Sequence, residues 1–535
     1  MNKKLLALVL AAVMLCTLFA ACAKTNEPST TTTEPEKTET TTNPEPQESE
    51  SEAPEQTPDE PQAPETFDPE DYTDLNMYMF DLRMVGADHG ERINQAINEY
   101  LGPKYGLQLH LTYFPVFDWI SKVQMNISAG DQVDLMSMCI MNGLAELYNN
   151  KMVLEISDLL EEYAPDALEI TKDYNPAYIR DGGLYGLPTM RGYITNLFIL
   201  MRRDILEELD MVEKAENLKS WSDYEEILEA VRDNYTEETG LWGLSKGSAR
   251  TCAPGGMYDS DELSSIVNWD SLGDAHSFIF TDNDGNVSFL LDDPRYEEKL
   301  AMIRRWRDNG LIWPDSSLSD SSGDELLKSN VTFSTFDSGE YGVQAVKEDN
   351  CGHPLVCFQY SNGWIHTGTL TGWGVGIPVT AEEPEAACKM INVLYTDETV
   401  MNLLIRGVEG EDYTVENGEV VYTEDPHYYE ADFVVGNNTL LVPLKGQGAD
   451  YYDRIKEINE SATMSPYLGF IVDNEGLTDL IANTSAVYDQ YYGDLHTGNY
   501  TPELYAEYKS KLEVAGIYDY LDAAQAQLTA WLANR

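Results

Sequence analysis

The segment that decides the fold is residues 181–206, DGGLYGLPTMRGYITNLFILMRRDIL. It opens with a turn at 181–183, and Pro188, with its fixed φ and no amide donor, marks a rigid exit rather than a strand interior. The loop at 189–193 then brings a hydroxyl, a guanidinium and a phenol close together before an apolar strand begins. This order predicts either a polar binding loop or a plain turn between two strands.

The elements before this segment alternate between strands and helices. Strands are expected at 75–80 and 107–114, with a helix at 91–101 between them and a further helix and strand by residue 135. This alternation predicts an α/β layer. Because the chain has 535 residues, it is too long for one core, and two or three domains are expected.

The elements after this segment continue in mixed order. Ser220 begins a helix as its N-cap, and Trp221 beside it is predicted to be a core anchor rather than a ligand platform. The strand at 372–378 has alternate glycines, which let another backbone or a ligand approach closely. Helices are expected at about 475–492 and 505–532.

Several short motifs resemble one family when they are read in order. They are Y-G-L-P at 185–188 with R-x-D at 202–204, A-G-D-x-x-D at 129–134, G-L-I-x-P-D at 310–315 and G-x-E-G-x-x-Y at 407–413. Together they resemble the extracellular solute-binding proteins of ABC importers, in the larger lipoprotein branch with a carboxy-terminal helical region. The resemblance extends over nearly all of 74–535. It implies an α/β, periplasmic-binding-protein-like type II fold with two lobes, a hinge and a ligand cleft.

Boundaries for the two lobes follow from this resemblance. Lobe one is expected at 73–188 with about 335–380, and lobe two at 189–334 with about 381–535, including the carboxy-terminal helices. The chain is expected to cross between the lobes near 185–191 and near 333–339.

The first 72 residues are expected to contain a signal peptide, a lipidation site and a linker. Residues 1–21 have two lysines and then an apolar run too short to span a bilayer, which predicts a signal peptide. Ala20-Ala21-Cys22 resembles a lipobox, so Cys22 is expected to be lipidated and to anchor the protein at the extracellular face of the membrane. Residues 22–72 are rich in proline, threonine and glutamate and are predicted to be a disordered linker. An ordinary secreted protein is the alternative.

The formal net charge is −59. Such a chain repels polyanions, so nucleic acid is excluded as a partner. Because acidic residues are so common, two neighbouring carboxylates are weak evidence for acid–base catalysis.

The sequence predicts neither a metal site nor a cofactor. The histidines lack zinc spacing, and there is no C-x-x-C. Around Asp282, Asp284 and Gly285, the calcium-loop register would put Phe280 and Leu291 at ligand positions, so a hairpin turn is favoured. Free thiols are expected, although pairing of Cys351 with Cys357 remains open.

The motif search favours a binding protein over an enzyme. There is no phosphate loop and no H-E-x-x-H. Residues 243–247 fit G-x-S-x-G around Ser245, but the residues after them look like a loop, whereas a nucleophile elbow needs a helix there. A carbohydrate-active enzyme with two distant carboxylates and a surface adhesin remain as alternatives.

Aromatic and polar residues together suit a saccharide. The chain has 33 tyrosines and 9 tryptophans, whose faces pack against sugar C–H groups while polar side chains bind hydroxyls. A sugar or oligosaccharide is the expected ligand, with a peptide or another polar nutrient as the alternative. The resemblance implies a monomer that delivers its ligand to an ABC transporter permease. The candidate ligand-binding residues are Arg83, His89, Asn142, Thr189, Arg191, Tyr193, Trp242, Asp337, Ser338, Trp364 and Trp373.

Overall fold

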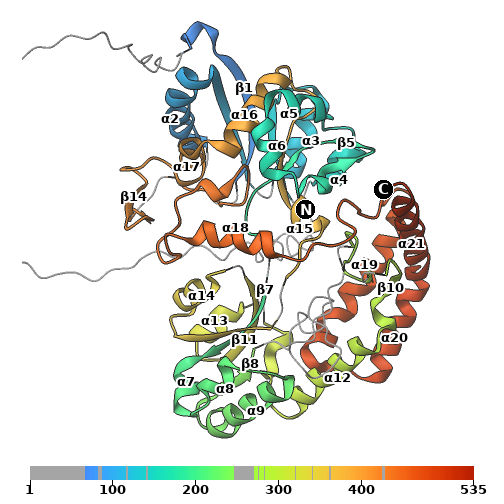
Figure 1. Ribbon diagram of the computed structural model, residues 1–535. Coiled ribbons are helices and arrows are strands. Elements are labelled where there is room, and N and C mark those ends of the chain that lie inside the picture. Colours follow the sequence, from blue (N-terminus) through green and yellow to red (C-terminus); the bar gives the residue numbers. More distant parts are fainter. Residues whose placement is uncertain are drawn as a thin grey trace, which may run out of the picture.

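The chain forms two lobes, one above the other, with a group of long helices beside the lower one (Figure 1). The computed structural model describes residues 67–81, 87–115, 118–139, 143–194, 196–245, 270–274, 276–281, 284–319, 321–339, 341–360, 363–424 and 428–535, without the side chains of 87–89. The predicted signal peptide therefore lies outside the described residues, as do Cys22 and most of the predicted linker.

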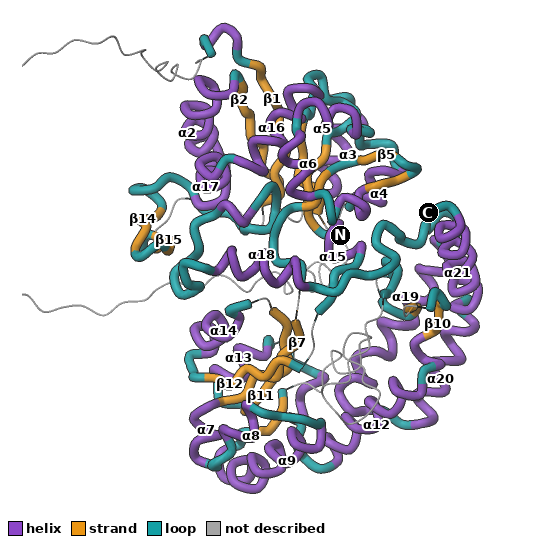
Figure 2. The backbone as a smooth tube through the Cα atoms, viewed as in Figure 1, coloured by secondary structure: helices purple, strands orange, loops and turns teal. Residues whose placement is uncertain are grey.

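The upper lobe is built on a mixed sheet whose strand order is β2-β1-β3-β13-β6. The strands are β1 (Thr73–Asp81), β2 (Leu107–Pro115), β3 (Leu135–Cys139), β6 (Leu187–Pro188) and β13 (Trp373–Gly376). Both β2 and β3 run parallel to β1, and their carboxyl ends point towards the lower lobe (Figure 2). From Met77 onward every residue of β1 is buried, as expected for a central strand covered on both faces.

Helices cover both faces of this sheet. The helices of the upper lobe are α2 (Ala87–Tyr105), α3 (Trp119–Ala129), α4 (Leu144–Asn149), α5 (Ser157–Tyr163), α6 (Pro165–Thr171), α15 (Thr367–Thr371), α16 (Pro384–Thr396), α17 (Glu398–Arg406) and α18 (Tyr451–Ser461). Helix α18 lies below the sheet, on the side of the lower lobe (Figure 1). The hairpins β4 (Ile179–Arg180)–β5 (Gly183–Leu184) and β14 (Tyr413–Glu416)–β15 (Glu419–Tyr422) form two separate small sheets.

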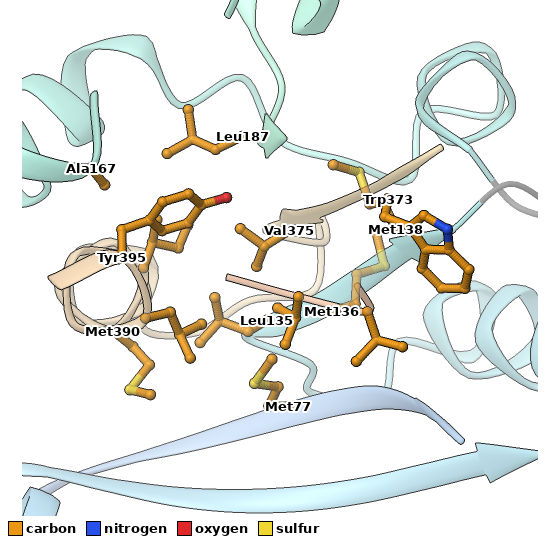
Figure 3. Close-up of a cluster of buried hydrophobic side chains, with 14 of the residues drawn as sticks. Met77, Leu135, Met136, Met138, Ala167, Leu187, Trp373, Val375, Met390 and Tyr395 are labelled. Atoms are coloured by element: carbon orange, nitrogen blue, oxygen red, sulfur yellow. The ribbon is translucent and has the colours of Figure 1, made fainter. Parts of the chain in front are cut away.

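The upper core brings distant parts of the chain together (Figure 3). Tyr395 of α16 lies beside Leu135 and Val375, and its hydroxyl donates to the Pro188 carbonyl at 2.7 Å. The expected close approach at the glycines of β13 is confirmed, because a Cβ on Gly374 would lie 2.6 Å from the backbone oxygen of Leu187.

The lower lobe has its own sheet, in the order β12-β7-β11-β8. The strands are β7 (Asn196–Arg202), β8 (Trp242–Leu244), β11 (Thr332–Gly339) and β12 (Leu355–Gln359), and β7 is antiparallel to both of its neighbours. The hairpin predicted around Gly285 is formed by β9 (Ile279–Thr281) and β10 (Val287–Phe289). The helices are α7 (Arg203–Glu208), α8 (Val212–Glu216), α9 (Trp221–Val231), α10 (Glu237–Thr239), α12 (Pro294–Asp308), α13 (Gly323–Lys328) and α14 (Val343–Cys351).

Two tryptophans form the centre of the lower core. Trp221 is fully buried, and its ring centroid lies 6.1 Å from that of Trp306 on α12. The Ser220 side chain accepts from the Asp223 amide and caps α9, as the sequence predicts. The expected role of Trp221 as a core anchor is therefore confirmed.

Helices α19 (Thr478–Asp494), α20 (Pro502–Val514) and α21 (Ile517–Ala533) pack on the lower lobe. Their side chains Tyr491, Tyr508 and Leu528 belong to the same core cluster as Trp306. The single helix expected at 505–532 is divided by Gly516, whose φ of 99° lies in the left-handed region.

The lobe boundaries differ from those predicted. Three crossings join the two cores, because Ile194, Ile365 and Leu468 belong to the upper cluster while Ile199, Tyr360 and Phe470 belong to the lower one. The predicted crossing at 333–339 is instead an interior strand, since β11 bonds to β7 on one side and to β8 on the other.

The expected assignment of 381–535 to lobe two is also corrected, because helices α16 to α18 pack in the upper core. Local sequence patterns show that a helix has a buried face, but they do not show which of two cores receives it.

Free thiols are found where the chain is described, at Cys139, Cys351, Cys357 and Cys388. In the same residues no group of three or more His, Cys, Asp or Glu side chains could hold a metal ion. Among the helices of the described ranges, none is both long and apolar enough to cross a membrane.

One buried histidine joins α12 to the turn after α19. The His496 Nδ1–H donates to the Tyr492 carbonyl at 2.8 Å, and Nε2 accepts the Tyr296 hydroxyl at 3.0 Å. Because a carbonyl can only accept, this arrangement fits the neutral ring. Burial lowers the pKa of His496 to about 4.

We predict that this histidine makes the lower lobe less stable in acid. In the unfolded chain His496 has a pKa of about 6.5, so between pH 6.5 and 4 the unfolded state binds the extra proton. Its contribution is fully present above pH 6.5 and is lost as the pH falls towards 4, by up to about 3 kcal/mol. Urea unfolding at pH 7 and pH 5 should show a smaller loss for His496→Gln than for the parent. Equal losses would contradict the prediction.

Candidate ligand-binding cleft

A cleft with a volume of about 650 Å³ lies between α18 of the upper lobe and the end of the lower sheet. Strand register explains why it forms there. Asn196 at the start of β7 pairs with Gly339 at the end of β11, and Phe198 pairs with Gln359 at the end of β12. The lining residues are Ile194, Asn196, Phe198, Tyr341, Gly342, Val343, Gln344, Cys357, Gln359, Gly363, Ile458, Ser461, Ala462 and Thr463.

Among the residues that the structure describes, the lining contains no Asp, Glu, Lys, Arg or His. Its polar groups are the amides of Asn196, Gln344 and Gln359 and the hydroxyls of tyrosine, serine and threonine. Between them lie apolar surfaces such as Phe198 and Ile458. In a chain with a net charge of −59, this arrangement suits a neutral ligand that has both hydroxyl groups and apolar faces.

Tyr341 is the exposed aromatic ring of the lining, with 44% of its surface accessible. It precedes α14 in the lower lobe, and its ring centroid lies 6.2 Å from that of Tyr451 on α18 of the upper lobe. An aromatic face at this position is available to a ligand that enters between the lobes.

Asp337 lies outside this lining, in an ion pair within the lower lobe. The buried Lys347 ammonium bonds to Asp337 at 2.5 Å and to Asp324 at 3.1 Å. Since removing one partner of a buried charge is costly, Asp337 has a structural role here. The neighbouring predicted residue, Ser338, is buried in β11.

The predicted binding loop at 189–193 packs into the upper lobe. Thr189 is fully buried, and Tyr193 is only 1% exposed, with its hydroxyl donating to the Thr189 carbonyl at 3.0 Å. Arg191 donates to the carbonyls of Gly192 and Thr369, at 2.8 and 2.9 Å. In this structure the loop fixes the start of the first crossing and exposes little to a ligand.

The three predicted tryptophans lie in different places. Trp373, 7% exposed, sits at the carboxyl end of the upper sheet against Phe80 and Phe433, at 5.3 and 4.9 Å between ring centroids. Trp364 is half-buried next to Gly363 of the lining. Trp242 pairs with Thr332, at the end of the lower sheet away from the cleft.

The remaining candidates cannot be placed. Arg83 and Asn142 lie outside the described residues, in the segments that directly follow β1 and β3. His89 lies in α2, but its side chain is outside the described set. Of the predicted residues that the structure describes, none belongs to the cleft lining.

Sequence reasoning missed the residues that do line the cleft. They come from the start of β7, the start of α14, the end of β12 and the end of α18, which are far apart in the chain. The glycines on either side of Glu340-Tyr341 were the local signal that could have marked an exposed ring.

Comparisons with known proteins agree with this architecture. The model of a family described as bacterial extracellular solute-binding protein matches residues 95–407, and that of a domain of unknown function matches 466–533. A curated relative from Streptococcus pneumoniae serotype 4, a carbohydrate ABC transporter substrate-binding protein, is 20% identical over 470 residues, 84% of this chain and 89% of its own.

Solved structures share the fold at low identity. The N-glycan transport solute-binding protein NgtS from Streptococcus pneumoniae has a TM-score of 0.70 at 17% identity, covering 86% of this chain and 99% of that chain. The substrate-binding protein FusA from the same species, in complex with kestose, gives 0.57 at 18%, covering 86% and 100%. An extracellular solute-binding protein from Bifidobacterium longum subsp. infantis gives 0.61 at 14%, covering 87% and 99%. These likenesses show the two-lobed α/β fold.

We predict that Tyr193 stabilises the upper lobe by packing in its core. Replacing Tyr193 by Ala removes a buried aromatic ring and should lower the free energy of unfolding by about 3–5 kcal/mol. Tyr193→Phe, the matched control, loses one hydrogen bond and should cost about 1 kcal/mol. Urea unfolding measures both, and an alanine variant as stable as the parent would show that the ring is not a core residue.

Proposed function

This chain belongs to the bacterial extracellular solute-binding protein family, and on that premise we propose that it captures a neutral saccharide and delivers it to an ABC transporter permease. Members of the family act outside the cell membrane, and the relatives are transport proteins rather than enzymes. Lipidation at Cys22, with residues 23–72 as a tether, would keep the protein near that permease.

The uncharged cleft is the observation that carries the saccharide proposal. A charged ligand would lose water on entering and would need an opposite charge, which none of the described lining residues offers. A neutral sugar can instead bond to amide and hydroxyl groups of the lining, while its C–H faces pack on Phe198 and Tyr341. The volume of about 650 Å³ falls within the range of small-molecule sites, roughly 300–1,000 Å³.

The relatives support the same ligand class. Structures of NgtS contain Man1GlcNAc and Man5GlcNAc, and the FusA structure contains kestose. For this chain we therefore favour a neutral oligosaccharide over a peptide. The cleft lies beside all three crossings, so rotation of the lobes about them would close it over the ligand.

A thermal-shift screen tests this proposal. We expect kestose or short mannosyl-N-acetylglucosamine oligosaccharides to raise the Tm, with about 2.7 kcal/mol of stabilisation at 100 times Kd. Alginate oligomers, which carry carboxylates, and short charged peptides should have no effect. A response to peptides alone would favour the peptide-binding alternative, and consumption of the sugar would favour an enzyme.

We predict that Tyr341 contributes directly to affinity. Tyr341→Ala should weaken binding of the sugar found in the screen about tenfold, since an aromatic face contributes about 1 kcal/mol beyond its buried area. The Tm without ligand should stay within about one degree, because 44% of the residue's surface is accessible and the ring lies outside both cores.

Tyr518→Ala is the matched control for isothermal titration calorimetry of this variant. Tyr518 is 37% exposed and lies on α21, away from the cleft. Equal affinities for the Tyr341→Ala, Tyr518→Ala and parent proteins would remove Tyr341 from the binding surface.

A further inference from the structure

The third crossing, residues 464–473, is shared between the two cores. Leu468 packs in the upper core, whereas Tyr467, Phe470 and Val472 pack in the lower one. The segment therefore cannot shift without disturbing both lobes.

The upper lobe holds this crossing through backbone bonds. The Ser465 amide donates to the Ile365 carbonyl at 2.7 Å, and the Ile365 amide donates to the Thr463 carbonyl at 2.9 Å, so the second and third crossings lie side by side. The Gly469 amide donates to Thr367 Oγ1 at 2.9 Å. A Cβ on Gly469 would lie 2.7 Å from the Pro176 oxygen, so a side chain there would collide with the upper lobe.

The body of the lower lobe holds the same crossing at both of its ends. At one end the Ser465 hydroxyl donates to the Asp270 carboxylate at 2.6 Å, and both side chains are buried. At the other end the Val472 amide donates to the Leu272 carbonyl at 2.9 Å.

Helix α21 adds a row of contacts along the crossing. The Gln527 side-chain amide makes two hydrogen bonds to the backbone of Asp473. Its Oε1 accepts from the Asp473 amide at 2.7 Å, and its Nε2 donates to the Asp473 carbonyl at 3.0 Å. The Trp531 ring lies 5.7 Å from that of Phe470, and the Arg535 guanidinium donates to the Pro466 carbonyl. The contacts at Pro466, Phe470 and Asp473 lie on both sides of Gly469.

We infer that α21 is a positioning element of the hinge between the lobes. It fixes the third crossing to the lower lobe and thereby sets how readily the lobes rotate. The α21 contacts stabilise the unrotated arrangement of the lobes, whereas rotation of the lobes opens the bond between Gly469 and Thr367. This assigns a role to the region 466–533, whose family model has no known function. That model contains both α21 and the segment that α21 holds.

The chain offers a matched control on the same helix. Gln525 makes two hydrogen bonds to the backbone of the β9–β10 hairpin, just as Gln527 does to the crossing. Its Oε1 accepts from the Val287 amide at 2.7 Å, and its Nε2 donates to the Gly285 carbonyl at 3.1 Å. Both glutamines are half-buried. Gln525→Ala therefore removes the same kind of bonds without touching the crossing.

Hydrogen–deuterium exchange on the full mature chain, without ligand, tests the inference. Gln527→Ala should speed exchange at the amides of Ile365, Ser465 and Gly469 about tenfold, because these bonds open when the lobes rotate. Gln525→Ala should leave them within about twofold of the parent while speeding exchange at Val287. Trp531→Ala should act in the same direction as Gln527→Ala.

Two outcomes would overturn the inference. Equal acceleration in the Gln527→Ala and Gln525→Ala variants would show general loosening of α21, and unchanged exchange at Ile365 and Gly469 in Gln527→Ala would show that the hinge does not depend on α21. Since no ligand is present, either result is independent of whether the saccharide proposal holds.

Discussion

The connection between the two lobes depends on the backbone hydrogen bonds that join Ile365 to Thr463 and Ser465. These bonds hold two crossings side by side, so the lobes are linked by a short two-stranded ribbon rather than by independent linkers. The first crossing lies close by, because Ile194, Gly363 and Thr463 all contribute to one cleft lining. A hinge of this kind restricts the lobes to a few relative motions, which lets a cleft between them open and close while each core stays intact.

Charge is kept away from the cleft in a strongly acidic protein. Lys347 is buried in α14, where Asp324 and Asp337 neutralise its ammonium group, and the described residues of the lining are uncharged. The large negative charge of the chain therefore does not decide what the cleft binds. Selection in the cleft depends on neutral hydrogen-bonding groups and apolar faces, which suits ligands that carry many hydroxyls.

Much of the fold could be predicted from the sequence. Alternating strands and helices, the Ser220 cap, the burial of Trp221 and the hairpin around Gly285 all depend on nearby residues, and the structure contains each of them. The site was harder to predict. Tyr193, in a polar loop after a proline, has the same local pattern as a ligand-stacking residue, yet its ring packs in the upper core. Local sequence does not distinguish these two roles, because both need an aromatic ring near polar groups.

The sequence by itself determined the order of the elements, the family and the acidic character of the protein, because each depends on residue identity or on patterns within one element. Only the tertiary structure decided which core receives α16 to α18, where the chain crosses and which residues line the cleft. These features depend on strand register, such as Gly339 opposite Asn196, and on packing between segments far apart in the chain. Register is set by which long-range partners fit together, so short sequence patterns do not reveal it.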